Sequence, residues 1–360
     1  MIPTSLQGTY RYGVIGTGMM GQEHIVNVTG IPNAEVVAVA DPVPQSVTEA
    51  LALAPEADGY ADYQDLLDRD DVDVVVLASP NYTHIDILGD MIDSGKHLLV
   101  EKPLCTTVDD CQRVIEQAKG ATQQIMVALE YRYMPPVARL VEEVRNGSVG
   151  TAKMVAMREH RFPFLPKVGD WNRFSRNTGG TLVEKCCHFF DLMNLILEER
   201  PYRVMASGAQ DVNHLNEEYN GERPDILDNA FVILDYPSGA RASLDLCMFA
   251  EATHNQEEVS VIGDKGKVEA LIPEGVIRRG TRGVHRIGQV ETEVVSTDHI
   301  AVEGLHHGAS YLEHLELLTS IEQGRPPVIG LEEGLWSVAA GVAAHRSIEE
   351  GRPVELKEVL

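Results

Sequence analysis

The stretch Arg11-Tyr-Gly-Val-Ile-Gly-Thr-Gly-Met-Met-Gly21 is a short apolar run that ends in a glycine-rich turn. Its last six residues have the pattern G-x-G-x-x-G, and the residues that follow have helical character. A second β-rich run, Glu35–Ala40, then ends at Asp41, 20 residues past the last glycine. Strand, glycine turn, helix, strand and acid in this order predict a dinucleotide-binding unit.

Each glycine has a separate task in such a turn. Gly16 permits the tight turn, Gly18 lets the backbone approach a pyrophosphate, and Gly21 lets helix and strand pack closely. The phosphates then bind at the partly positive helix N-terminus. Asp41 is expected to accept hydrogen bonds from the adenosine ribose and to repel a 2′-phosphate, so NAD is favoured over NADP. The other turn residues expected at the cofactor are Thr17, Met19 and Met20.

Strand-like and helix-like segments continue to alternate up to residue 129. Strands separated by helices pair in parallel, which predicts a doubly wound sheet. Ligands of such sheets bind beyond the carboxyl ends of the strands. The residues that follow these strand ends are expected beside the cofactor or the substrate: Ser79, Asn81, His84, Glu101, Lys102, Glu130 and Tyr131.

Composition excludes several classes of function. The 360 residues are 44% hydrophobic and 24% charged, and the formal net charge is −25. This length suits two domains. A strongly acidic surface repels nucleic acids and anionic lipids, and we see neither a membrane span nor a secretory signal. The five cysteines lack a C-x-x-C pair, so we expect reduced thiols in a cytoplasmic protein and no metal site.

The segment Glu184-Lys-Cys-Cys-His-Phe-Phe-Asp191 places polar residues in an otherwise apolar, helix-like run. On a continuous helix, Glu184, His188 and Asp191 fall at i, i+4 and i+7 and project from one face. A solvated polar face would explain this pattern equally simply. Lys185 would then be a salt partner on the helix surface.

Four motifs together resemble the Gfo/Idh/MocA family, which includes glucose–fructose oxidoreductases and inositol dehydrogenases. They are the glycine turn, "ASPNYTH" after the third strand, "GKHLLVEKP" at the next, and "GG" before the helix with the acid and the histidine. The resemblance implies an α/β protein with a Rossmann domain over residues 1–129. It also implies a second α/β domain over residues 130–360, built on a large, mostly antiparallel open sheet. That sheet commonly forms the subunit interface in the family, so a homo-oligomer, dimer or tetramer, is expected.

The resemblance also assigns roles. Lys102 matches the active-site lysine, His188 the general base, and Asp191 a frequent substrate ligand. Glu184 stands where many relatives carry aspartate, so its partner is substrate, His188 or Lys102. In the implied reaction His188 takes the hydroxyl proton and Lys102 stabilises the developing alkoxide.

Two aromatic residues are further candidates. Tyr131 is expected to touch substrate or nicotinamide. Trp171 would pack on the sugar or on the nicotinamide ribose, and a buried core role explains it equally well.

Three functions use this set of residues. The first is an NAD-dependent dehydrogenase of a sugar or cyclitol. The second is an NAD-dependent glycoside hydrolase that oxidises C3, eliminates the aglycone, adds water and returns the hydride. The third is a protein that senses NAD without turnover, which the Lys102 and His188 pair disfavours.

The segment 151–176 reverses the charge of the chain, because it holds six cations and two acids. One interpretation is a pocket wall for an anionic substrate, held by Arg158, Arg161, Arg173 or Arg176, since arginine binds anionic groups bidentately. The alternative is charge pairing with acidic neighbours or with a second subunit.

Overall fold

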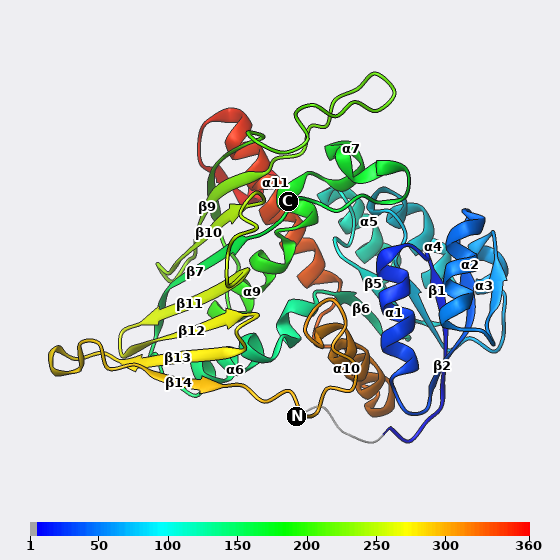
Figure 1. Ribbon diagram of the computed structural model, residues 1–360, viewed down its shortest axis with the longest axis horizontal. Helices are drawn as coiled ribbons and strands as arrows, with labels where there is room; N and C mark the ends of the chain where they lie inside the picture. The colour runs from blue at the N-terminus through cyan, green and yellow to red at the C-terminus, as the bar shows by residue number, and fades with distance from the viewer. Residues whose placement is uncertain (1–5) are drawn as a thin grey trace. The chain divides into compact units, whose positions relative to one another are not determined.

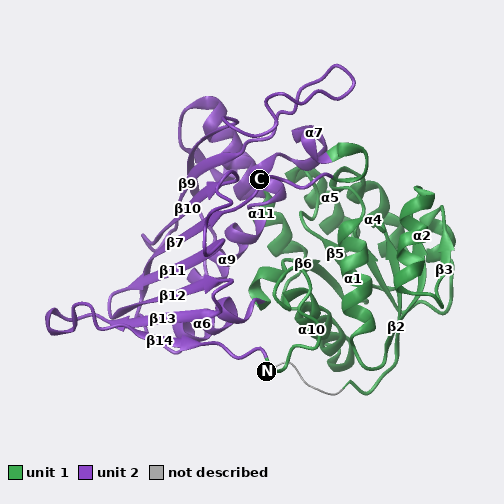
Figure 2. Ribbon diagram, viewed as in Figure 1, with its two compact units in different colours: residues 1–133, 167–171, 298–338 green, residues 134–166, 172–297, 339–360 purple. Residues whose placement is uncertain are grey.

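The computed structural model describes residues 6–360 and divides into two compact units (Figure 2). Unit 1 comprises the chain up to Tyr133, the short segment Lys167–Trp171, and Asp298–Val338. Unit 2 comprises Met134–Pro166, Asn172–Thr297 and Ala339–Leu360. The sequence predicts a single domain boundary, between residues 129 and 130. In the structure, residues 298–338 also belong to unit 1.

Unit 1 is built on a six-stranded parallel sheet with the strand order β3-β2-β1-β4-β5-β6 (Figure 1). This is the doubly wound order of dinucleotide-binding folds, so the predicted fold class is confirmed. The central strands are continuous apolar runs because helices cover both faces of such a sheet; all four residues of β4 are fully buried. The strands are β1 Tyr10–Ile15, β2 Ala34–Ala40, β3 Asp58–Tyr60, β4 Val74–Leu77, β5 His97–Glu101 and β6 Ile125–Ala128.

The crossover helices of unit 1 begin with recognisable caps where the sequence supplies them. Asp62 accepts a hydrogen bond from the Gln64 N–H at the start of α3, and Thr107 accepts one from the Asp110 N–H at the start of α5, as N-cap side chains do. The helices are α1 Met19–Thr29, α2 Pro44–Leu53, α3 Tyr63–Leu67, α4 His84–Asp93 and α5 Val108–Gln117, with 3-10 turns η1 Asn81–Thr83, η2 Glu130–Tyr133 and η3 Val168–Arg173.

Helix α10, Ala309–Gln323, completes unit 1 from the far end of the chain (Figure 1). It packs against α1, η2 and β6, and its residues are almost all buried as far as Ser320. A helix that is buried on most sides is part of a core, although several of the buried residues of α10 are polar. The physical reason for the shifted domain boundary is therefore that unit 1 needs this helix to cover its sheet.

Unit 2 contains a nine-stranded sheet with the order β14-β13-β12-β11-β7-β10-β9-β8-β15. Strands β7 and β10 pair in parallel and the other neighbours pair antiparallel, which confirms the predicted, mostly antiparallel sheet. The strands are β7 Ala152–His160, β8 Arg203–Ala209, β9 Asn229–Asp235, β10 Arg241–Cys247, β11 Glu257–Gly263, β12 Gly266–Ile272, β13 Val276–Thr281, β14 Glu291–Val294 and β15 Val354–Glu355.

The two faces of this sheet differ because side chains alternate along each strand. One face is covered by helix α9, Cys187–Leu197, and by the end of α11, Leu331–Glu350, whose Ser347 hydroxyl accepts a hydrogen bond from the Ala206 N–H of β8. The opposite face, here called the open face, keeps large apolar side chains exposed. They are Met154, Met205, Phe231 and Ile233, with exposed fractions from 45% to 65%.

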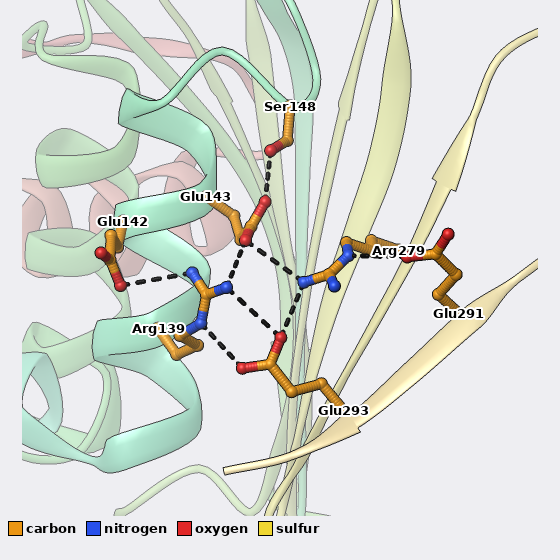
Figure 3. Close-up of polar contacts among 7 residues, drawn as sticks. All are labelled: Arg139, Glu142, Glu143, Ser148, Arg279, Glu291 and Glu293. Atoms are coloured by element: carbon orange, nitrogen blue, oxygen red, sulfur yellow. Dashed lines mark hydrogen bonds and ion pairs between the residues drawn. The ribbon is translucent and has the colours of Figure 1, made fainter.

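An ion-pair network joins helix α6, Pro135–Arg145, to the β13–β14 edge of the sheet (Figure 3). Arg139 Nε lies 2.9 Å from Glu293 Oε1, and Arg279 NH1 lies 2.7 Å from Glu293 Oε2. Glu143 contacts both arginines and the hydroxyl of Ser148. In this network the two arginines pair with carboxylates of unit 2 and have a structural role.

Among the described residues, no helix is long and apolar enough to cross a membrane.

Candidate active site

The glycine turn of unit 1 excludes side chains at two positions and leaves a third open. Gly16 has φ +84°, and a Cβ there would lie 2.4 Å from the backbone nitrogen of Ser79. A Cβ on Gly21 would lie 2.0 Å from the Gly16 carbonyl oxygen, whereas a Cβ on Gly18 would meet nothing within 4 Å. The open side of Gly18 is therefore where a ligand can approach the backbone.

The carboxylate of Asp41 is fixed against this turn. Its Oδ2 accepts the Thr17 N–H at 2.8 Å, and its Oδ1 accepts the Val43 N–H at 2.8 Å. Each carboxylate oxygen can accept more than one hydrogen bond, so Asp41 retains capacity for ribose hydroxyls. The turn and the acid that the sequence predicts thus lie in direct contact.

The residues of this turn fit the pyrophosphate of a dinucleotide. Helix α1 begins at Met19 with no side-chain cap and no acid in its first turn, which suits its N–H groups to an anion. Two buried polar atoms, Thr17 Oγ1 and Asn81 Nδ2, have no hydrogen-bond partner within residues 6–360. Buried polar groups are rarely left unpaired without a functional reason.

His84, expected at the cofactor, is held by two backbone carbonyl groups. Its ring is fully buried; Nδ1 lies 3.0 Å from the carbonyl oxygen of Pro103, and Nε2 lies 3.2 Å from that of Ser79. Burial lowers its pKa, which keeps the ring neutral. His84 therefore ties two loops at the carboxyl edge of the sheet together, and both of its nitrogens face protein.

Trp171 joins the same edge of unit 1. Its ring lies edge-on to Tyr82 of the "ASPNYTH" segment, with the ring centroids 6.3 Å apart. The segment Lys167–Trp171 belongs to unit 1 although unit 2 residues surround it in the sequence. Trp171 is half-buried, so a fully buried core role does not describe it.

Glu101 lies beneath Lys102 and faces the interior. Its Oε2 accepts the Lys102 N–H at 3.1 Å, and its Oε1 lies 3.0 Å from His24 Nε2. Burial raises the pKa of Glu101, but the hydrogen bond from His24 and the charge of the neighbouring Lys102 outweigh burial and lower that pKa. Glu101 is thus a buried carboxylate that contacts protein groups.

Glu130 and Tyr131, at the end of β6, are also buried. His306 Nε2 lies 3.7 Å from Glu130 Oε1, and the His306 ring lies 6.3 Å from that of Tyr131. The sequence gives no hint of this contact, because His306 is distant in the chain and has no acid at a ligand-like spacing.

In unit 2 the "GG" motif sets the start of helix α8, Thr181–Glu184. Gly179 and Gly180 have φ values of +79° and +86°, a conformation that favours glycine. The ring of His345 lies against Gly180, where a Cβ would come within 2.4 Å of Nε2. The same nitrogen accepts the Leu182 N–H at 3.1 Å, so His345 holds the first turn of α8.

The predicted continuous helix over "EKCCHFFD" is wrong. Glu184 ends α8, residues 185 and 186 form a turn, and α9 begins at Cys187. The Cys187 thiol donates to the Glu184 carbonyl oxygen at 3.6 Å, which occupies the acceptor that a continuous helix would offer to residue 188. His188 and Asp191 do share one helix face, and both are buried together with Glu184.

Lys185 is buried and does not lie on the helix surface. Its Nζ lies 2.8 Å from Glu159 Oε1 of β7, and Arg161 NH1 lies 3.1 Å from the same oxygen. Glu159 pairs across the sheet with Glu257 of β11, whose pKa is raised by burial and by Glu159. The charged residue between Glu184 and His188 thus anchors the turn to the sheet.

Each candidate arginine of segment 151–176 has an acidic partner. Arg158 lies on the open face of the sheet and contacts Glu258, whereas Glu159 points to the face that carries α9. The sheet therefore separates Arg158 from His188, which is evidence against a shared substrate. Arg173 Nε lies 3.1 Å from Glu217 Oε2, and Arg176 contacts Glu222. The first part of this segment is strand β7, which the sequence reasoning missed.

Comparisons with known proteins match the chain to two family models, one for each part of the chain. Residues 10–129 match the model described as oxidoreductase family, NAD-binding Rossmann fold, and residues 141–356 match that described as oxidoreductase family, C-terminal alpha/beta domain. Myo-inositol 2-dehydrogenase of Thermotoga maritima is 29% identical over 97% of this chain and 99% of its own. Inositol 2-dehydrogenase of Rhizobium meliloti is 27% identical over the same shares.

Solved structures show the same fold. The crystal structure of a probable dehydrogenase from Thermotoga maritima has a TM-score of 0.77 and 27% identity, over 97% of this chain and 100% of that chain. Levoglucosan dehydrogenase in complex with NADH and levoglucosan has a TM-score of 0.83 at 19% identity, over 97% and 99%, which shows the fold alone. Unit 1 contains an NAD-binding Rossmann domain, and NAD is its cofactor.

Proposed function

Since the chain belongs to the Gfo/Idh/MocA family of oxidoreductases, we propose that it oxidises a secondary hydroxyl group of an uncharged sugar or cyclitol with NAD. The full-length match to proteins named inositol 2-dehydrogenases carries this proposal. Both units are shared with these relatives, so the residues of both are expected to serve the same type of reaction.

The proposed chemistry divides between the two units. NAD, when bound, accepts the hydride from the alcohol carbon. Neutral His188 of unit 2 removes the hydroxyl proton, and the Lys102 ammonium of unit 1 stabilises the charge that develops on the oxygen. Glu184 and Asp191 are proposed to bind neighbouring hydroxyl groups, because carboxylates accept such hydrogen bonds well.

An uncharged substrate is favoured over an anionic one. Arg158, Arg161, Arg173 and Arg176 each contact a carboxylate of the same unit. An arginine that is already paired offers less to a substrate anion, since binding would first have to break the existing pair.

The test is a substrate screen with NAD, in which NADH formation is followed. We expect net NADH with inositols or free sugars, and little with their phosphorylated or carboxylated counterparts. Aryl glycosides serve as the contrasting probe. Release of the aglycone without net NADH would select the hydrolase instead, and absence of turnover on every probe with NAD bound would favour a sensor.

We also propose that the open face of unit 2 contacts a second copy of the chain. Across neighbouring strands Met205 pairs with Ile233, and Phe231 lies two residues along from Ile233, so their exposed side chains form one apolar area. Phe231→Lys should reduce the mass measured by light scattering, whereas Val26→Lys, on the partly exposed Val26 of α1, should not. An unchanged mass in both variants would remove this face from any interface.

A cytoplasmic location is proposed on the state of the cysteines. All five are thiols and not disulfides, and four of them are buried, as is usual in a reducing compartment. Cell fractionation tests this directly.

A further inference from the structure

Beneath Glu101, two histidines form a hydrogen-bonded chain that reaches helix α10. His24 of α1 places Nε2 3.0 Å from Glu101 Oε1, and its Nδ1 lies 3.0 Å from His314 Nε2. Both imidazoles are 0% exposed, and their rings meet edge to face with centroids 5.1 Å apart. Three elements of unit 1 thus converge on the carboxylate that precedes Lys102.

The positions of the protons follow from donors and acceptors. The Glu101 carboxylate can only accept, so the His24 nitrogen that faces it must carry hydrogen. A neutral imidazole has one N–H, so His24 Nδ1 is an acceptor and His314 Nε2–H is its donor. The opposite tautomer of His24 would direct a bare nitrogen at a carboxylate, which is repulsive.

The surroundings of His314 argue against a doubly protonated, charged His24. An imidazolium at His24 would donate to His314 Nε2 and move the hydrogen of His314 to Nδ1. That nitrogen is buried and has no hydrogen-bond partner within residues 6–360. A buried N–H without an acceptor is rarer and more costly than an acceptor without a donor, so both rings are neutral and protonated at Nε2.

We propose that His24 and His314 are positioning residues for Lys102, through Glu101. His314 Nε2–H donates to His24 Nδ1, and His24 Nε2–H in turn donates to the carboxylate and holds it in the orientation in which its other oxygen accepts the Lys102 N–H. The backbone from which the Lys102 side chain extends is thereby fixed. This inference rests on the proposed catalytic function of Lys102.

The other ionisable groups around the chain are compatible with this arrangement. Burial, aided by Glu130, Glu101 and Glu23, raises the pKa of Glu313 well above its usual value. Burial lowers the pKa of His314 well below its usual value. Tyr12 packs edge-on to His314, and burial raises the pKa of its hydroxyl group. The charge of Lys102 lowers the pKa of Glu101.

Two substitutions of similar size separate hydrogen bonding from packing. His314→Gln keeps an N–H donor near the position of Nε2, whereas His314→Phe fills the space without a donor. In the full chain with NAD, we expect kcat to fall about tenfold in His314→Phe, as outer hydrogen-bond partners typically cause. The KM for NAD should stay unchanged, and His314→Gln should keep most of the activity. Equal kcat values in the two variants would overturn the proposal.

Imidazole nitrogen spectra of 15N-histidine-labelled protein test the same chain without turnover. Signals of His24 and His314, assigned by their loss in His24→Gln and His314→Gln, should show protonated Nε2 and bare Nδ1. In His314→Phe the His24 ring should keep its Nε2–H, which Glu101 fixes, and the signal of its bare Nδ1 should shift because the hydrogen bond from His314 is lost. A His24 ring protonated at Nδ1, or at both nitrogens, would refute the arrangement. Because this readout needs no substrate, it holds or fails independently of the proposed oxidation.

Discussion

The ammonium group of Lys185 lies 2.8 Å from Glu159 Oε1, so the residue after Glu184 faces the sheet and not solvent. Both side chains are buried. Burial, with the charge of Arg161, lowers the pKa of Lys185 even though Glu159 and Glu257 oppose the shift. Burial and Arg161 together therefore destabilise the charged form of Lys185 more than Glu159 and Glu257 stabilise it. The pair nevertheless fixes the turn between α8 and α9.

Lys185→Met should destabilise the protein by about 3 kcal/mol, because the buried carboxylate of Glu159 loses one of its two cationic partners. The double variant Lys185→Met/Glu159→Leu should recover at least half of this loss, since removing both partners removes the unpaired charge. Urea unfolding measures both, with the exposed Lys153→Met as control. A single variant as stable as the wild type would show that the pair does not hold the turn.

His345 makes stability depend on pH in the acid range. Burial lowers its pKa from 6.5 to about 4, so the unfolded chain takes up the proton first. The contribution of neutral His345 to the free energy of unfolding is complete above about pH 6.5 and is lost as the pH falls toward about 4. Between about pH 7 and pH 5 the free energy of unfolding should fall by about 2 kcal/mol because of this residue. His345→Gln, which can still accept the Leu182 N–H, should lose correspondingly less stability over that interval.

Urea unfolding at the two pH values checks this prediction, and His285→Gln, at an exposed histidine of unit 2, is the control. Parallel pH dependence in the wild type and His345→Gln would mean that His345 is not the group that titrates.

Asp41→Ala should weaken the preference for NAD over NADP by about tenfold, because a charged acceptor and a repulsive charge disappear together. Dissociation constants for both cofactors, from fluorescence titration, give the ratio. Glu35→Ala, at an exposed acid of strand β2, which ends just before Asp41, should leave it unchanged. An unaltered ratio in Asp41→Ala would end the assignment of Asp41.

Lys102→Ala and His188→Ala should each lower kcat by about 100-fold or more, as loss of a proton-transfer or charge-stabilising group does. Both should still bind NADH, since the glycine turn is intact. Lys153→Ala and His285→Ala, at exposed positions, are the matched controls. Near-normal turnover in either test variant would remove that residue from the mechanism.

Single substitutions of Arg158, Arg161, Arg173 and Arg176 by Ala should leave the preference between neutral and anionic sugars unchanged, because each arginine is paired within unit 2. The ratio of kcat/KM values for the two substrate types is the measurement. A selective loss of activity on the anionic sugar in any variant would revive a substrate anion site.

The local sequence predicted those helices and strands whose apolar residues recur at a regular spacing. The glycine turn and the alternating strands and helices up to residue 129 lie where expected, because apolar runs and turn residues define them. Strand β7 was missed because its open face carries Met154 and Arg158, so the basic composition concealed the alternation. The break after Glu184 depends on a thiol and on a buried ion pair, and neither is visible as a period. The contact between His24 and His314 joins residues 290 positions apart, which no local pattern records.

The return of helix α10 has a consequence for how the chain comes off the ribosome. The nucleotide-binding strands are all made by residue 128, yet the helix that covers them is made only after residue 309, once most of unit 2 has been synthesised. Until then, the faces of α1 and β6 that α10 covers are exposed to water and to chaperones. A fragment that stops near residue 133 should therefore be recovered as an aggregate, and one in which residues 298–338 are joined directly behind it should be recovered folded.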